Sequence, residues 1–391
     1  MEYVGGSILT DDGFVEGSVG IEAGVVVELS KRKVADEVAR GIVIPSFTDA
    51  HTHLGDAFIR IELGGTLEEI VAPPHGLKHR LLAKADPQEV VMGIRTAVEG
   101  MTHGGTGAFL DFRESGIAGA RMLYEACLGM LIEPTCLGRP EDLRYDADEV
   151  GSLLRVCDGL GVSSMRDWPT PDLQRLALDA RRAGRMFAIH CSEVVREDID
   201  KVLDLKPTFL VHMAAAKEGD YERCADADVP IVVCPRSNAF FGFIPDIPLM
   251  LSAGVTLLLG TDNAMLGAPS MLREIDFAYR ISRLNGQASP EEILKMAIRG
   301  RKGLSGGANN GVQIGDKARL TILDIPAGAD PYSALLRATE DNVALVIHGE
   351  RKWQRRGEQK EAPQPRRGPS RGKPKSSGRL IRRNTRQPRT S

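Results

Sequence analysis

The sequence lacks long apolar runs and closely spaced cysteines. No apolar stretch reaches the roughly 18 residues that a membrane-spanning helix needs, and the first six residues lack the basic-then-apolar pattern of a signal peptide. The six cysteines lie at least nine residues apart, which leaves no CxxC pair for a zinc knuckle or a dithiol. These absences predict a cytoplasmic protein without a membrane segment, whose thiols are reduced and mostly buried.

The chain also has little net charge, only −3 over 391 residues, but its charges are unevenly distributed. Fifteen Lys and Arg and two Glu lie in residues 351–391, which leaves 35 basic and 51 acidic side chains in residues 1–350. The acidic body is a poor candidate for nucleic-acid binding. With 42% hydrophobic residues, the chain can bury the core of one barrel-sized domain or of two ordinary ones.

The last segment, residues 354–391, is rich in Arg, Lys, Pro, Gly, Ser and Gln and has almost no apolar residues. Such a segment cannot bury enough surface to offset its ordering entropy, so we expect a disordered basic tail. A tether to nucleic acid or to an acidic surface is the functional alternative. A reading-frame artefact would produce the same abrupt change of composition.

The pattern of apolar runs predicts an α/β fold. Residues 2–9 and 18–29 read as strands around the turn at residues 10–13, and a comparable β pattern returns at residues 318–324 and 342–348. Between them, eight short apolar runs alternate with helical patterns such as residues 171–184 and 270–285. The runs are residues 42–46, 105–111, 130–136, 162–165, 186–190, 208–212, 231–234 and 256–260. Eight strands with intervening helices is the count of a (β/α)8 TIM barrel.

Several of these runs end in side chains that can bind a metal. His51 and His53 follow the first run, and alternate residues of a strand point to the same side, so both imidazoles can face one ion. His190 ends another run, with Glu193 three residues later, and His212 and Asp262 follow two more. In a parallel barrel all strand carboxyl ends open onto one face, where active sites lie, so these residues are expected to converge.

With these residues in place, the chain resembles the amidohydrolase superfamily. Within that superfamily it resembles the group that contains cytosine deaminase, S-adenosylhomocysteine deaminase and the chlorohydrolases. The matching pieces occur in family order over residues 1 to about 350. They are PSFTDAHTH (45–53), HCSE (190–193), His212, CPRSN (234–238), GTDN (260–263) and GVQIGDKARL (311–320). The combination is specific for the superfamily and says little about the substrate.

The resemblance implies one divalent metal ion, zinc or iron, held by His51, His53, His190 and Asp262. It implies that Glu193 and His212 handle protons, together with Asp262. It also implies that residues 1–44 and 308–353 join into a small composite β-sandwich domain beside a barrel of residues 45–307.

A single metal is favoured over two. Binuclear members of the superfamily commonly use a carboxylated lysine, and no lysine occurs between Lys84 and Lys201, where strands two to five are expected. A bridging carboxylate remains conceivable in Glu133. The same residue can instead bind substrate or a neighbouring arginine.

The expected reaction is hydrolytic deamination of a nitrogen heterocycle such as a purine, pyrimidine or pterin by a metal-bound hydroxide. Hydrolysis of a cyclic amide or of a chloro-substituted ring is the alternative, and a non-catalytic protein that binds nucleic acid through its tail is a remote third. The partner is then a small heterocyclic substrate, and the sequence leaves open whether the chain forms a homo-oligomer.

Other polar residues are weaker candidates for the functional site. His75 and His79 lie in residues 54–86, a segment after the first strand that could act as a lid, while His103 and His348 are expected to be structural. Asn238 can brace a turn, Arg236 can meet an anionic group of the substrate, and a nucleophilic role for Cys191 is disfavoured because no base is left to serve it.

Overall fold

The structure is a computed structural model, and it describes residues 1–304, 311–325, 328 and 330–355. The predicted basic tail begins at residue 354, so all but its first two residues lie outside the described residues.

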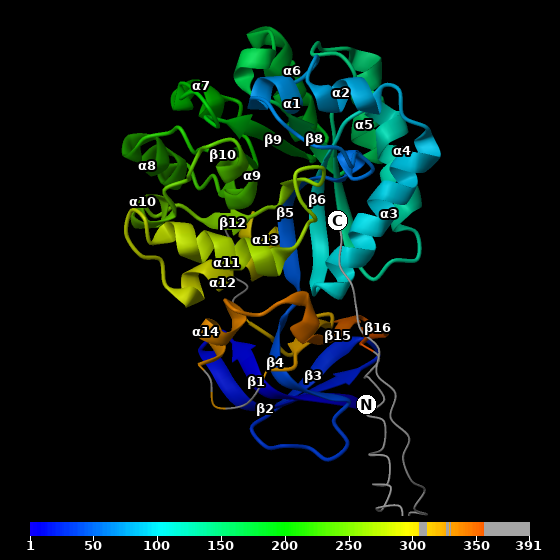
Figure 1. The fold of residues 1–391 in the computed structure, drawn as a ribbon, viewed down its shortest axis with the longest axis vertical. Coiled ribbons are helices and arrows are strands. Elements are labelled where there is room, and N and C mark those ends of the chain that lie inside the picture. The colour runs from blue at the N-terminus through cyan, green and yellow to red at the C-terminus, as the bar shows by residue number, and fades with distance from the viewer. Residues whose placement is uncertain (305–310, 326–327, 329, 356–391) are drawn as a thin grey trace, which may run out of the picture. The chain divides into compact units, whose positions relative to one another are not determined.

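The larger sheet has nine parallel strands, and it closes on itself. Only Gly260 and Thr261 separate β12 from β13, so the two are pieces of one barrel strand; β12 pairs with β11, and β13 pairs with β5. The result is the predicted α/β barrel (Figure 1). Its strands are β5 (Phe47–His53), β6 (Thr106–Arg113), β7 (Glu133–Gly138), β8 (Gly159–Val162), β9 (Met186–Cys191), β10 (Phe209–His212), β11 (Ile231–Val233), β12 (Leu257–Leu259) and β13 (Asp262–Asn263).

Amphipathic helices surround the barrel. In α6, for example, the buried residues recur at helical spacing, as Leu173, Leu176, Ala177 and Ala180. The helices are α1 (Leu67–Ile70), α2 (Leu77–Leu82), α3 (Pro87–His103), α4 (Gly116–Cys127), α5 (Ala147–Val156), α6 (Thr170–Arg182), α7 (Ile199–Asp204), α8 (Glu218–Asp226), α9 (Pro235–Phe240), α10 (Ile247–Ser252), α11 (Met271–Ser282), α12 (Pro290–Ile298), α13 (Gly300–Gly303) and α14 (Pro331–Leu335).

A second sheet joins the two ends of the described chain. Its order is β16-β15-β14-β4-β1-β2-β3, and β14 pairs antiparallel with β4. The predicted union of the two terminal β-stretches in one sheet is therefore confirmed. The strands are β1 (Glu2–Thr10), β2 (Gly13–Glu22), β3 (Val25–Ser30), β4 (Ala39–Pro45), β14 (Arg319–Leu323), β15 (Val343–His348) and β16 (Arg351–Gln354).

Three of the predicted strands were placed wrongly. The run at residues 42–46 lies almost wholly in β4 of the second sheet, and the first barrel strand is β5, whose many polar residues hid it. The run at residues 162–165 lies three residues too late, because β8 contains Gly159 and Gly161 and therefore has few apolar side chains. The segment 18–29 is two strands, since Ala23 and Gly24 turn the chain with positive φ angles of 47° and 74°.

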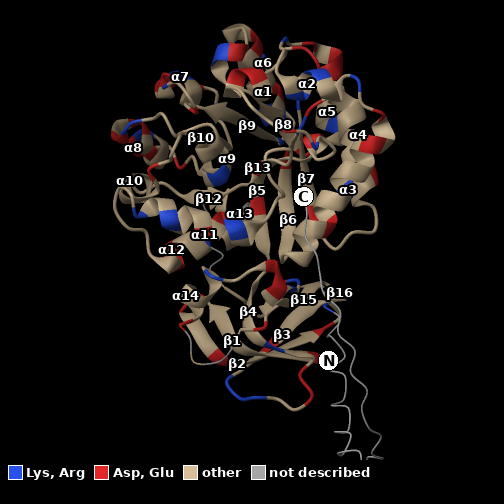
Figure 2. Cartoon of the chain, in the orientation of Figure 1, with Lys and Arg blue, Asp and Glu red and all other residues tan. Residues whose placement is uncertain are grey.

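Among the described residues, no helix combines the length and apolar character that crossing a bilayer requires. Acidic and basic residues alternate along the outer helices (Figure 2).

Candidate functional site

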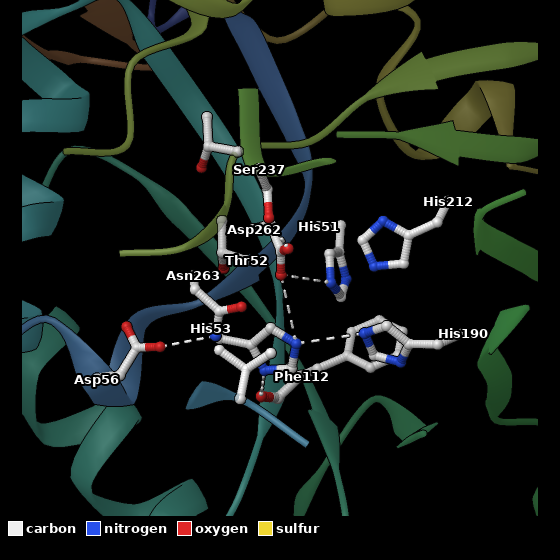
Figure 3. A network of polar contacts seen from close by, with 12 residues as sticks. His51, Thr52, His53, Asp56, Phe112, His190, His212, Ser237, Asp262 and Asn263 are labelled. Atoms are coloured by element: carbon white, nitrogen blue, oxygen red, sulfur yellow. Dashed lines mark hydrogen bonds and ion pairs between the residues drawn. The ribbon is translucent and has the colours of Figure 1, made fainter. Parts of the chain in front are cut away.

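The metal-competent residues that the sequence singled out meet at one end of the barrel. The ligand atoms of His51, His53 and His190 all lie within 4.8 Å of one another, and so do those of His51, His212 and Asp262. In Figure 3 the four imidazole rings gather around the Asp262 carboxylate. All five side chains are buried or nearly so.

The distances between these atoms suit a single small cation. His53 Nε2 lies 3.3 Å from His190 Nε2, and Asp262 Oδ1 lies 3.3 Å from His51 Nε2 and 3.6 Å from His53 Nε2. Ligands at bond lengths of about 2.0–2.1 Å around tetrahedral zinc stand about 3.3–3.4 Å apart. The four residues therefore fit around one ion of that size.

Hydrogen bonds turn the lone pairs of two histidines toward this point. His53 Nδ1 lies 2.7 Å from Glu114 Oε1 and 3.1 Å from the Phe112 carbonyl oxygen, and both of these atoms only accept. His190 Nδ1 likewise donates to the Val162 carbonyl oxygen at 2.8 Å. Each neutral ring therefore carries its proton on Nδ1, so the two Nε2 lone pairs face each other with no proton between them.

His51 supports the same conclusion, because neither of its buried ring nitrogens has a hydrogen-bond partner among the described residues. A buried polar atom without a partner is costly unless something else satisfies it. Burial lowers the pKa of His53 to about 3 and that of His190 well below its usual value, which keeps both rings neutral and able to bind a metal.

Asp262 is fixed by its neighbours. Ser237, at the start of α9, donates a hydrogen bond to Asp262 Oδ2. Although burial opposes ionisation, the close contact with His51 and the other nearby imidazoles hold the pKa of Asp262 well below its usual value. Asp262 and His212 also adopt left-handed backbone conformations, with φ of 65° and 76°, and such strain is typical of functional sites.

A second group of three residues, Glu193, His212 and Asn238, lies in mutual contact beside the first. His212 Nε2 lies 3.4 Å from Glu193 Oε1, and Asn238 Nδ2 donates to Glu193 Oε1 at 3.3 Å and contacts His212 Nδ1 at 3.1 Å. Because an amide NH2 only donates, His212 Nδ1 accepts and its proton resides on Nε2. Burial, together with the charge of Asp262, raises the pKa of Glu193 well above its usual value. Asn238 thus joins the two residues that the sequence placed in proton transfer.

Glu114 holds a network of buried charges that the sequence analysis missed. Besides His53, it contacts Lys78 Nζ at 2.5 Å, Arg113 Nη2 at 2.6 Å and Arg139 Nη2 at 3.5 Å. Glu114 directly follows β6, so a polar residue just after a strand was the signal that could have identified it.

A cavity of about 270 Å³ opens beside these residues. It is lined by the polar side chains of His53, His190, Glu193, His212 and Asp262, by Leu67, Val71, Ala72 and Pro73 of α1 and the chain after it, and by Val194 and Val195. Lys78 and Arg139 also line the cavity. The predicted lid segment therefore contributes to the cavity through α1 and α2.

The weaker candidates lie elsewhere. Glu133 is at the amino end of β7 and pairs with Arg319, so it cannot bridge two metals at the carboxyl end. Arg236 binds Glu274 instead of lining the cavity. Neither His75 nor His79 lines the cavity, and His79 bonds to the Val71 carbonyl oxygen.

The remaining residues behave as the sequence suggested. His103 stacks on Trp353 at a ring-centroid distance of 4.6 Å, and His348 contacts Lys317 in the second sheet. Cys191 lines the cavity, but burial raises the pKa of its thiol well above the usual value, which disfavours a nucleophilic thiolate.

Comparison with known proteins decides the family. The sequence pattern of the amidohydrolase family matches residues 42–351. The chain belongs to the amidohydrolase family. A relative of this amidohydrolase from Archaeoglobus fulgidus, named only in general terms as an aminohydrolase, is 36% identical over 279 residues, which make up 71% of this chain and 79% of the relative.

Two further matches extend over most of this amidohydrolase. The 5-methylthioadenosine/S-adenosylhomocysteine deaminase 1 of Archaeoglobus fulgidus is 26% identical, and the alignment covers 83% of this chain and 84% of the relative. An adenosine deaminase from Xanthomonas campestris, crystallised with bound zinc, has a TM-score of 0.74 and 17% identity and covers 90% of this chain and 92% of that one. At that identity the structural likeness shows the fold alone.

Proposed function

We propose that this amidohydrolase is a metal-dependent aminohydrolase that converts an amino group on a small nitrogen heterocycle to an oxo group and releases ammonia. The observation that carries the proposal is the position of Glu193, His212 and Asn238 beside the cluster of His51, His53, His190 and Asp262. Five of these side chains, those of His53, His190, Glu193, His212 and Asp262, line one cavity. The aminohydrolase and deaminase names of the sequence relatives support the same reaction class.

The ligands of the proposed metal are His51, His53, His190 and Asp262, and zinc fits their nitrogen and oxygen atoms. When bound, such an ion lowers the pKa of water so that hydroxide forms near neutral pH. The chain's own contribution is to orient the ligands through Glu114, the Val162 carbonyl oxygen and Ser237.

Three side chains then move and hold protons. The ionised Asp262 accepts the proton of the attacking water, and the Nε2–H of His212 orients the same water oxygen. Glu193, whose raised pKa favours the protonated form, donates its proton to a ring nitrogen of the heterocycle. The proton that Asp262 accepted then passes to the departing amine, and the added hydroxyl group returns its proton to Glu193, so water and the amine become the oxo product and ammonia.

The size of the cavity supports a small substrate. Ligand pockets commonly measure about 300–1,000 Å³, and this cavity, at about 270 Å³, is just below that range. Its apolar sides, formed by Leu67, Val71, Val194 and Val195, suit the faces of a flat ring.

Ammonia release from a panel of amino-purines, amino-pyrimidines and pterins by the zinc-loaded protein tests the proposal. We expect at least one turnover substrate, and we expect Glu193→Gln to lower kcat about 100-fold or more without loss of zinc. Exchange of the exposed Glu125 for Gln is the matched control. Hydrolysis of cyclic amides or release of chloride from chloro-substituted rings, with no ammonia from any amine, would refute deamination and identify the alternative hydrolase.

The domain organisation is also a proposal. We propose a barrel of residues 45–307 and a small sandwich of residues 1–44 and 308–353. The second sheet supports this because it has its own core, which includes Val4, Val19, Val43, Ile322 and Leu345. A cytoplasmic location is supported by the six free, buried cysteines.

A further inference from the structure

Arg139 occupies an unusual position on the cavity wall. It directly follows β7, and its backbone N–H donates to the Arg113 carbonyl oxygen at 3.0 Å. The residue is only 7% exposed, yet it lines the cavity. Its guanidinium group is therefore withdrawn from bulk water and reaches the space where a substrate would lie.

The guanidinium group has no hydrogen-bond partner among the described residues. Its nearest anion is Glu114, whose Oε1 lies 3.5 Å away. That carboxylate is already shared, because Lys78 Nζ and His53 Nδ1 contact the same oxygen at 2.5 and 2.7 Å and Arg113 holds the other oxygen at 2.6 Å. A buried arginine without a committed partner is costly, so the arrangement is poised for an additional anion.

The cavity is also lined by Glu68, Asp167, Glu193, Glu197 and Asp262, and none of these carboxylates forms an ion pair with Arg139 in the described structure. Glu197 accepts hydrogen bonds from the Ser164 hydroxyl and from the Ser192 backbone N–H. Glu193 lies against His212 and Asn238. Asp167 is close enough to favour the charged form of Arg139, but the described structure contains no ion pair between them.

We propose that Arg139 binds a carboxylate group of the substrate, so that the substrate is a small amino-heterocycle with an acidic substituent. The planar guanidinium fork matches a carboxylate with two parallel hydrogen bonds, and Lys78, which contacts the same Glu114 oxygen, is a second cation that lines the cavity. The proposal rests on the proposed deaminase function and makes its substrate class narrower.

The test uses pairs of heterocycles that differ only in a carboxylate against an isosteric carboxamide, such as cytosine-5-carboxylate and cytosine-5-carboxamide, or pterin-6-carboxylate and its amide. With the zinc-loaded protein we expect kcat/KM for a carboxylate to exceed that for its amide at least tenfold. Arg139→Gln should raise KM for the carboxylate about 10-fold to 100-fold, with a smaller change in kcat, and should remove the preference. Arg139→Lys should restore part of it.

Arg144→Gln is the matched control, because Arg144 is exposed and does not line the cavity. If the kcat/KM values of the wild-type protein for a carboxylate and for its amide differ by less than about threefold, the proposal is overturned even if the Arg139 variants do not fold. A preference that survives in Arg139→Gln also overturns it.

Binding of the same compounds, followed as a rise in Tm, separates this proposal from the proposed function. A carboxylate that stabilises the wild-type protein but not Arg139→Gln, with no ammonia from any compound, refutes deamination and leaves the carboxylate site standing. Ammonia release with higher kcat/KM for neutral compounds supports deamination and refutes the carboxylate site.

Discussion

Replacing Glu114 by Gln should weaken zinc binding through His53 without removing a ligand. Glu114 Oε1 lies 2.7 Å from His53 Nδ1, and it accepts the proton that leaves Nε2 free to coordinate. A glutamine can still offer an oxygen there, but it carries no charge. Losses of this kind in the residues behind the ligands typically reduce metal affinity about 10-fold to 100-fold, which equals about 1.4–2.7 kcal/mol.

The same change should also destabilise the fold. Lys78, Arg113 and Arg139 are all nearly buried around Glu114, and each loses part of its counter-charge. Breaking a buried ion pair by removing one partner costs about 3–5 kcal/mol, so this term is expected to exceed the loss of zinc affinity. The midpoint of urea unfolding should therefore fall even in metal-free protein.

Two measurements on one protein preparation distinguish these effects. Competition with a chromophoric chelator gives the zinc affinity, and urea unfolding with and without zinc gives the stability. Glu125→Gln, an exposed carboxylate on α4, should change neither. Wild-type zinc affinity in Glu114→Gln would show that this carboxylate does not support the ligand His53, and the reasoning would be wrong.

Three further predictions concern separate parts of the molecule. Asn238→Ala should lower kcat about 10-fold to 100-fold in the ammonia assay, because His212 loses the amide that fixes its ring. The zinc content should stay unchanged, and a reduced zinc content would contradict the prediction. Burial and Lys317 lower the pKa of His348 to about 4, so its stabilising contribution is lost as the pH falls from about 6.5 through 4. In His348→Gln the free energy of unfolding, measured in urea, should therefore fall less steeply over this pH range. The same pH dependence in variant and wild type would refute this prediction. Leu176→Ala, fully buried on α6, should cost about 2–5 kcal/mol of unfolding free energy, and a cost below about 1 kcal/mol would contradict the packing of α6 on the barrel.

The residues that the sequence brought together share one property, which is that each lies at or just beyond the carboxyl end of a strand. For His190, His212 and Asp262 the chain supplies a short apolar run and then one metal-competent side chain, whereas His51 lies within the largely polar β5. Parallel pairing forces such ends to one face, so the sequence could predict convergence without any knowledge of distances.

The strand assignment failed where the local signal was weak. β8 has glycines at positions 159 and 161, and a Cβ at Gly159 would come within 2.3 Å of the Met186 carbonyl oxygen. The close approach of neighbouring strands requires glycine there, and the same requirement removes the apolar side chains by which a buried strand is recognised.

The contrast between Arg236 and Arg139 shows why charge partners are harder to predict than ligands. Both arginines follow closely on barrel strands, and the sequence analysis named Arg236 as a residue that can meet an anionic group of the substrate. In the fold, Arg236 pairs with Glu274 of α11, which lies 38 residues further along the chain. Arg139 instead shares Glu114 with Lys78 and Arg113, both held more tightly. Which cation is left for a ligand depends on how many others compete for the same carboxylate, and that competition exists only once distant segments have packed.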